Sequence, residues 1–393
     1  MTIPSLVDLC VPRPGSTTLR GVWSQALRRT LSDLRTVLQV HADGPSAADV
    51  REFWQAVAPL ARQAPGALLA VLRRTEVGVW LRCLRPGASV SVSTAEGLAA
   101  LLCTMALHLT RTGALTQPLR LQAWPDRIVD AGARIGLRVP PRTRALHFGA
   151  GQVVAETPDG RIWLPLEADD AAFVPIPGSM VRLALVDTNP LSSLEAHPEK
   201  SGNALDLGGQ PVERWREALG DGLHTIARHL PAFREEIELL VQQVIPVGFD
   251  TEQHRSATIT EAVGALYLGL HPNPMTMVEA LVHETSHNKM SALFELDPVL
   301  DNPPEQTYAS PLRPDPRPLR GVLLAVHAFL PVVALYDAMI EAQAPGSEHP
   351  AFVRRRDHIA RGNHDGICVL RAHARPTAVG RQLLDEIQAL DAR

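Results

Sequence analysis

Residues 276–294 have the sequence TMVEALVHETSHNKMSALF, and this stretch decides how the rest of the chain is interpreted. It contains His283, Glu284 and His287 with the spacing H-E-x-x-H. On a helix, residues four apart lie about one turn apart on the same face, so the two imidazoles can bind one metal ion. Glu284 would then lie at the flank of the metal, where it could orient or deprotonate a bound water. The pattern predicts a metal-binding helix.

Local signals favour a helix at this position. Thr276 and Glu279 have the S/T-x-x-E spacing of a capping box, and Pro274 ends the segment before them. The competing interpretation is a chance match, with two ordinary helix histidines beside an exposed glutamate. We favour the metal site because the motif falls on a capped, amphipathic helix.

The composition is that of a globular protein. The chain has 393 residues, of which 45% are hydrophobic and 20% charged, enough for two domains or one large domain. A net charge of -4 gives no electrostatic reason to expect nucleic acid or an anionic membrane as a partner. The four cysteines lack C-x-x-C spacing and the N-terminus lacks a signal-peptide pattern, so we expect a cytoplasmic protein.

The N-terminal half has two patterns. Between residues 17 and 113, apolar residues recur at spacings of three and four, which predicts a bundle of about four helices. Residues 152–156 and 161–165 flank the turn sequence Thr-Pro-Asp-Gly and predict a β-hairpin, and residues 181–186 predict a further strand. Our predicted organisation is a helical bundle over 1–125, a β-rich segment over 126–190 and a metal-binding catalytic domain over 191–393.

The predicted fold class is α+β, mainly helical, with a zincin-like C-terminal domain behind a helical and β-hairpin N-terminal region. Residues 265–270 predict a strand directly before the motif helix. We expect the edge of that strand to be free to pair with an extended peptide, which is a general mode of peptide recognition.

A second candidate block begins at Tyr308. Asp315 and Pro316 predict the start of a helix that continues through His327. The most apolar run of the chain, residues 321–336, is shorter than a membrane span and contains His327 and Pro331, so we expect a buried core helix there. A buried neutral imidazole needs a partner, which could be a backbone carbonyl or a metal. Because two histidines need a third ligand, His327 is the favoured candidate.

The same block contains Arg313, Arg317 and Arg320. A guanidinium binds a carboxylate through two parallel hydrogen bonds, so one of these arginines could hold a substrate or co-substrate about two helical turns (~10 Å) from the metal. Arg320 is favoured because it shares a predicted helix face with His327. The alternative is a solvated basic turn.

Two segments, VEALVHETSHNKMSAL (278–293) and YASPLRPDPRPLRGVLLAVHAFLPV (308–332), resemble a bacterial family of HExxH-motif peptide-modification proteins found in ribosomal-peptide pathways. The resemblance covers roughly residues 205–390. It implies a non-haem Fe(II) enzyme that uses 2-oxoglutarate to hydroxylate a side-chain β-carbon of a ribosomally synthesised precursor peptide. It also implies that His283, His287 and His327 bind the metal, and that the arginine block, with Tyr308, serves 2-oxoglutarate or peptide carboxylates.

Two other classes of protein remain open at this point. A zinc metallopeptidase would use the same two histidines, with Glu284 as general base. A peptide-binding module could have kept the helix without activity. The extended metzincin pattern is absent, because Met290 stands where it requires glycine and Leu293 where it requires histidine. That absence and the arginine cluster favour the oxygenase.

Overall fold

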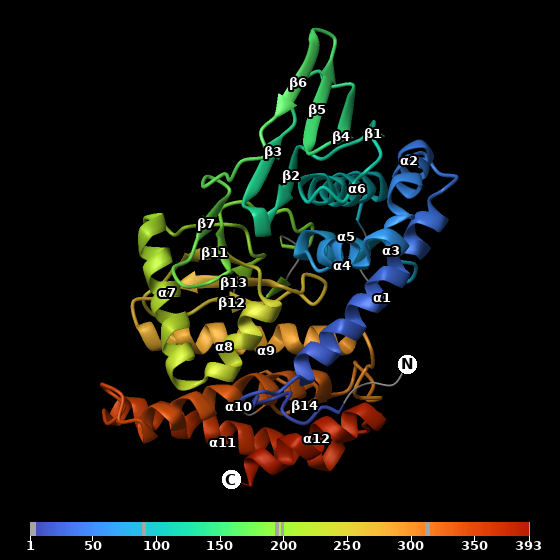
Figure 1. The fold of residues 1–393 in the computed structure, drawn as a ribbon. Helices are drawn as coiled ribbons and strands as arrows, with labels where there is room; N and C mark the ends of the chain where they lie inside the picture. Colours follow the sequence, from blue (N-terminus) through green and yellow to red (C-terminus); the bar gives the residue numbers. More distant parts are fainter. Residues whose placement is uncertain (1–4, 89–91, 193–195, 198–199, 311–314, 393) are drawn as a thin grey trace.

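The computed structural model describes residues 5–88, 92–192, 196–197, 200–310 and 315–392. It has two parts, which are drawn one above the other in Figure 1. The upper part holds the N-terminal helices and an antiparallel sheet. The lower part holds a second sheet and the helices of the C-terminal half. The expected mixture of α and β structure is confirmed, with more residues in helices than in strands.

The N-terminal segment is helical, as predicted. Its helices are α1 (Thr18–Val40), α2 (Ala47–Val57), α3 (Leu60–Gln63), α4 (Pro65–Leu72), α5 (Thr75–Leu84) and α6 (Thr94–Arg111). The described residues of this segment form more helices than the four expected, because residues 58–59 separate α2 from α3 and Arg74, with an extended backbone, separates α4 from α5. α6 is buried along nearly its whole length and forms the centre of the upper part.

The sheet of the upper part packs on α6. Its strand order is β1-β4-β5-β6, and neighbouring strands are antiparallel. The strands are β1 (Leu119–Leu121), β4 (Ala145–Gly149), β5 (Gln152–Thr157) and β6 (Gly160–Leu164), with β2 (Arg127–Asp130) and β3 (Ile135–Arg138) paired beside them. The predicted hairpin is confirmed: β5 and β6 pair up to Thr157 opposite Gly160.

The sheet of the lower part is mixed, with the order β12-β13-β11-β8-β7. Its strands are β7 (Phe173–Pro175), β8 (Arg182–Ala184), β11 (Gln243–Phe249), β12 (Ser256–Ala257) and β13 (Ala265–Leu270). β8, β11 and β13 are parallel, and the outer strands β7 and β12 are antiparallel to their neighbours. The domain boundary predicted at residue 190 therefore falls inside this sheet, with β7 and β8 before it and β11 to β13 after it.

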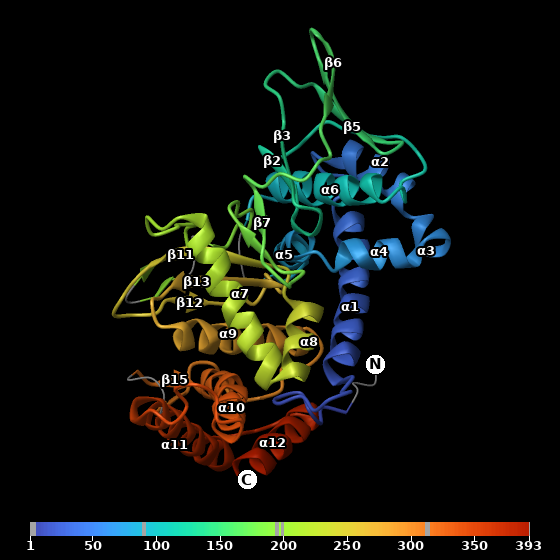
Figure 2. The ribbon, with the colours of Figure 1, turned by 60° about the vertical axis from the view of Figure 1, so that its left-hand side comes forward.

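Helices cover this sheet in layers (Figures 1 and 2). They are α7 (Val212–His229), α8 (Pro231–Leu240), α9 (Pro274–Phe294), α10 (Leu319–Glu341), α11 (Pro350–His373) and α12 (Ala378–Asp391). α9 lies between the sheet and the layer formed by α10 to α12. α10 is long and apolar enough to cross a membrane, but 56% of its most apolar window is buried. It packs against α9 and α11, which is typical of a core helix.

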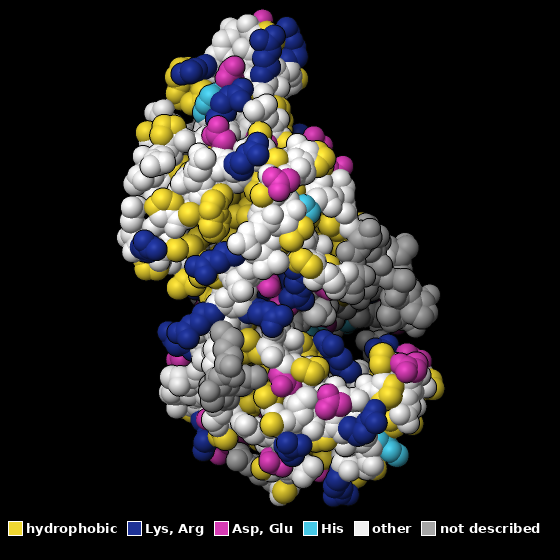
Figure 3. Space-filling model, turned by 90° about the vertical axis from the view of Figure 1, so that its right-hand side faces the viewer, with side chains coloured by type: hydrophobic (Ala, Val, Ile, Leu, Met, Phe, Trp, Pro, Cys, Tyr) yellow, Lys and Arg dark blue, Asp and Glu magenta, His cyan; other side chains and the backbone are white. Residues whose placement is uncertain are grey.

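The two parts share apolar and polar contacts. Figure 2 shows α1 running from the lower part to the upper one, and its first turns pack in one apolar cluster with residues of α9, α10 and α12. Arg82 of α5 and Arg85, directly after α5, bind the carboxylate of Glu295, directly after α9, at 3.1 and 2.8 Å. Arginine side chains also gather along the band between the two parts on the face shown in Figure 3. The N-terminal helices α1 and α5 thus contact α9 or the residue that follows it.

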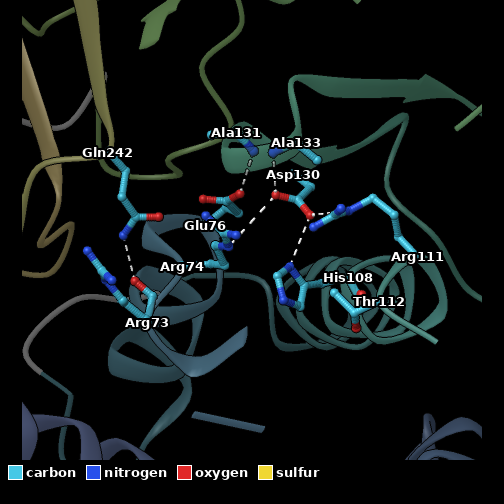
Figure 4. Close-up of polar contacts among 10 residues, drawn as sticks. All are labelled: Arg73, Arg74, Glu76, His108, Arg111, Thr112, Asp130, Ala131, Ala133 and Gln242. Carbon is cyan, nitrogen blue, oxygen red and sulfur yellow. Dashed lines mark hydrogen bonds and ion pairs between the residues drawn. The ribbon is translucent and has the colours of Figure 1, made fainter. Parts of the chain in front are cut away.

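A buried carboxylate holds the upper part together (Figure 4). Asp130, which is 1% exposed, ends β2 and accepts hydrogen bonds from His108 Nδ1 at 3.0 Å and Arg111 Nε at 3.3 Å. Arg74 Nε lies 3.8 Å from the same carboxylate. Burial by itself would raise the pKa of Asp130, but the hydrogen bond from His108 and the charges of Arg74 and Arg111 outweigh it and lower the pKa. The carboxylate therefore joins α5 and α6 to β2 in its charged form.

We expect Asp130→Asn to destabilise the fold by about 3 kcal/mol, because it leaves cationic partners around a buried neutral group. In the wild type, the folded-state pKa lies below the ordinary value of about 3.9, so this contribution is present above that pH and is lost as the pH falls through the folded-state pKa. Urea unfolding of both proteins at pH 7 measures the effect, and the difference between them should shrink at pH 3. Asp159→Asn, at an exposed pair with Arg142, should leave the unfolding midpoint unchanged. Equal midpoints for Asp130→Asn and the wild type would contradict the account.

Candidate metal centre

The motif helix α9 begins at Pro274, two residues before the predicted start. Its N-cap is Asn273, whose side chain accepts a hydrogen bond from the Met275 amide at 3.0 Å. The predicted capping box of Thr276 and Glu279 is therefore wrong. An asparagine followed by proline supplies the cap and the first helical residue, and the Glu279 side chain is used elsewhere.

α9 places His283, Glu284 and His287 together, as the spacing predicts. One ligand atom from each lies within 4.8 Å of the other two, and the Nε2 atoms of the two histidines are 2.9 Å apart. Two nitrogens that bind one metal at about 2.05 Å with a right angle between the bonds have the same separation. The two imidazoles are half-buried and lie nearly perpendicular, at 89°. This arrangement fits a cation between them.

Glu284 is held from the side of the sheet. Its side chain is 2% exposed, and its Oε2 accepts a hydrogen bond from Thr258 Oγ1 at 2.7 Å. Thr258 follows the edge strand β12. The carboxylate is thus fixed beside the histidines by a residue that lies 26 positions earlier in the chain.

His327 lies in α10 and is completely buried. Among the residues that the structure describes, neither of its ring nitrogens has a hydrogen-bond partner. Burial lowers the pKa of His327 well below its usual range, and the charges of Lys289, His287 and His283 act in the same direction. The imidazole is therefore neutral, the form that binds metals. His327 does not belong to the described group of ligand atoms within 4.8 Å, so its role as third ligand stays a prediction.

A cavity of about 1190 Å³ opens beside the motif. His283, Glu284 and His287 form part of its wall, with other residues of α9, residues 253–258 around β12, Arg317 and residues of α10 and α11. The predicted strand at Ala265–Leu270 is confirmed as β13, but the prediction that its edge is free is wrong. β13 lies between β11 and β12, and the short strand β12 forms the edge beside the cavity.

Of the described residues predicted to bind carboxylates, only Arg317 lines the cavity. Arg317 lines the cavity, and its Nε donates to Asp315 at 3.0 Å. Arg320 is exposed, does not line the cavity and stacks on the ring of Phe294, 3.7 Å from its centroid. Tyr308 packs on the ring of His373, also away from the described cavity wall. Arg313 lies outside the described residues.

Arg317 lines the cavity in place of the predicted Arg320 because the helix starts later than predicted. The helix predicted to start at Asp315 starts at Leu319, because β15 (Arg317–Pro318) pairs with β14 (Thr307–Tyr308). Arg317 therefore lies in a short strand before the helix. The boundary is set by the pairing of two short strands, which helix start signals at Asp315 do not reveal.

A polar cluster at the cavity was missed by the sequence analysis. Glu279 lies one turn before His283, and its carboxylate accepts hydrogen bonds from Arg355 Nε and Nη2, the latter at 2.7 Å, and from the Tyr336 hydroxyl. All three residues line the cavity. The sequence pattern predicts Glu279 in a capping box. Arg355 lies 76 residues away, so no local pattern reveals this contact.

Comparisons with known proteins add no assignment: no protein-family model matches the chain, and no curated protein matches it. The family resemblance is therefore supported only by the residues of segments 278–293 and 308–332.

We expect His283→Ala and His287→Ala each to weaken Fe(II) or Zn(II) binding by more than about 100-fold, since even the loss of an outer partner of a metal ligand costs 10- to 100-fold. Metal titration with a competing chelator measures this. His364→Ala is the matched control, because His364 is exposed and pairs with Asp391 at 3.0 Å. Stoichiometric metal binding by the double variant His283→Ala/His287→Ala would reject the site.

His327→Ala tests the third ligand in the same titration. A comparable loss of affinity is expected if His327 binds the metal. Full metal occupancy in this variant would remove His327 from the ligand set while leaving the other two histidines in place.

Proposed function

We propose that this protein is a non-haem Fe(II) enzyme that uses 2-oxoglutarate to hydroxylate a side-chain β-carbon of a peptide bound in the cavity. The observation that carries the proposal is the pair of imidazoles 2.9 Å apart in the wall of a cavity that also contains arginine side chains. It adds to the resemblance of the two segments to HExxH peptide-modification proteins.

The residues present fit such a metal. His283 and His287 would hold it, and the buried, unpartnered nitrogens of His327 make that residue the candidate for a third position. Three protein ligands on one side leave room for a chelating oxoacid and for O₂. When bound, Fe(II) with 2-oxoglutarate supplies O₂-dependent hydroxylation of a C–H bond.

The cavity offers anchors for carboxylates. Arg255, Arg317 and Arg355 line it, against the carboxylates of Glu279 and Glu284. Arg317 comes from the arginine block and can present its guanidinium to a dicarboxylate co-substrate, with Asp315 holding one side of the group. The volume of about 1190 Å³ exceeds the roughly 300–1,000 Å³ of sites for small ligands, so a peptide segment and a co-substrate can be bound together.

The sheet edge supports a peptide as the substrate. β12 is antiparallel to β13 and has the cavity on its other side, so an extended chain could pair with it and run past His283 and His287. We propose a zincin-like role for this edge, with β12 beside the metal-binding helix in place of the β13 edge that the sequence predicted. In this proposal the peptide lies along β12, and the reacting side chain points toward the metal.

A zinc peptidase is the second candidate, and the placement of Glu284 favours it. Thr258 binds Oε2, which leaves Oε1 available to take a proton from an attacking water. A bound Zn(II) would supply the acidity of that water. The same cavity and sheet edge would hold the peptide.

Products separate the two chemistries. With Fe(II), ascorbate, 2-oxoglutarate and a library of candidate peptides, we expect succinate and a peptide heavier by one oxygen atom, detected by mass spectrometry. Cleaved peptide from the Zn(II) form without any succinate from the Fe(II) form would reject the hydroxylase in favour of the peptidase.

Arg317→Gln tests the carboxylate anchor. Loss of a charged hydrogen-bonding partner should raise the KM for 2-oxoglutarate by about 10- to 100-fold, measured from the rate of succinate formation. Arg320→Gln, which changes a side chain stacked outside the cavity wall, should leave that KM unchanged. The reverse pattern would return the anchor to Arg320.

A further inference from the structure

Thr258 is placed beside the metal centre by the sheet and not by the motif helix. It directly follows β12, whose residues Ser256 and Ala257 pair with Leu268 and Tyr267 of β13. This pairing fixes the backbone on the edge of the sheet and directs the Thr258 hydroxyl to Glu284. Thr258 lines the same cavity as the motif residues.

The Thr258 hydroxyl has one proton and two acceptors within reach. Its Oγ1 is 2.7 Å from Glu284 Oε2 and 3.2 Å from the Glu284 carbonyl oxygen. That carbonyl also has Asn288 Nδ2 within 3.3 Å. The shorter contact, to a carboxylate oxygen, is the stronger hydrogen bond, so the Thr258 hydroxyl donates to Glu284 Oε2.

The Glu284 carboxylate is close enough to the histidines to become a ligand itself. One of its oxygens lies within 4.8 Å of a ring nitrogen of His283 and of His287. Carboxylate oxygens bind both iron and zinc, so a rotation of this side chain toward the histidines could place one on a metal that they hold. The hydrogen bond from Thr258 therefore decides whether the Glu284 carboxylate binds the metal or stays beside it.

We propose that Thr258 is a positioning residue that keeps the Glu284 carboxylate beside the metal and not bound to it. The inference depends on the metal site under Proposed function and holds for either chemistry. In the hydroxylase it keeps a coordination position open for the co-substrate or O₂. In the peptidase it keeps Glu284 available as a base. Without the hydrogen bond, Glu284 rotates onto the metal.

Co(II) is a suitable probe, because its visible absorption changes with the number and type of ligands. In Thr258→Val, which keeps the shape but removes the donor, we expect a changed Co(II) spectrum and Co(II) binding about tenfold tighter. The kcat should fall by about 10- to 100-fold with little change in the peptide KM. Thr258→Ser retains the hydroxyl and should restore the wild-type spectrum and kcat.

Two controls separate this role from packing. Thr285→Val makes the same substitution next to Glu284 in α9, where the hydroxyl has no hydrogen-bond partner in the described structure, and should behave as wild type. Glu284→Gln and Thr258→Val/Glu284→Gln should have the same Co(II) spectrum, because an amide is a poor ligand and nothing is left for Thr258 to restrain.

The outcomes are distinct. An unchanged Co(II) spectrum and affinity in Thr258→Val would overturn the role of Thr258 while leaving the metal site intact. A Thr258→Ser variant that fails in the same way as Thr258→Val would also overturn it, in favour of a packing role. A wild-type protein that binds no Co(II) would overturn the metal site itself, and this inference with it.

Discussion

The structure depends on how a helix with many polar residues is buried. α9 is inaccessible along most of its length between the mixed sheet and α10, yet it carries Glu284, Asn288 and Lys289 inside the protein. Buried polar groups destabilise a fold unless they are hydrogen-bonded. Each of these residues has a partner on a different element, and these partners fix the position of the helix.

The partners come from three segments: Thr258 after β12, the start of β13, and α8. The amide of Asn288 accepts from Gly264 N at 2.6 Å and donates to Ala265 O at 3.2 Å, which joins the helix to the start of β13. Lys289 pairs with Glu236 of α8 at 2.5 Å. Because these contacts fix both the translation and the rotation of α9, the face with His283 and His287 is directed to the cavity. The geometry of the site is therefore a consequence of the fold around the helix and not of the motif alone.

The sequence predicted those features that depend on local pattern. H-E-x-x-H located the two histidines on one helix face, and apolar periodicity located the N-terminal helices, β13 and the β5–β6 hairpin. It failed where distant segments meet. A strand of two residues, β12, has no periodicity to detect, so the edge was assigned to β13. The pairing of β14 with β15 moved the start of α10 and replaced Arg320 by Arg317 in the cavity wall. Thr258 and Arg355 reach α9 from 26 and 76 residues away, beyond any local signal.

The central claim is that two imidazoles of α9 bind one metal ion. X-ray absorption spectroscopy of the anaerobically purified, Fe(II)-loaded full chain tests it most directly, since imidazole ligands give a characteristic outer-shell scattering that carboxylate and water lack. The account predicts nitrogen or oxygen ligands at about 2.1 Å, with the outer-shell signal of at least two imidazoles, and loss of that signal in His283→Ala/His287→Ala. A first shell of oxygen ligands without imidazole scattering in the wild type would contradict it.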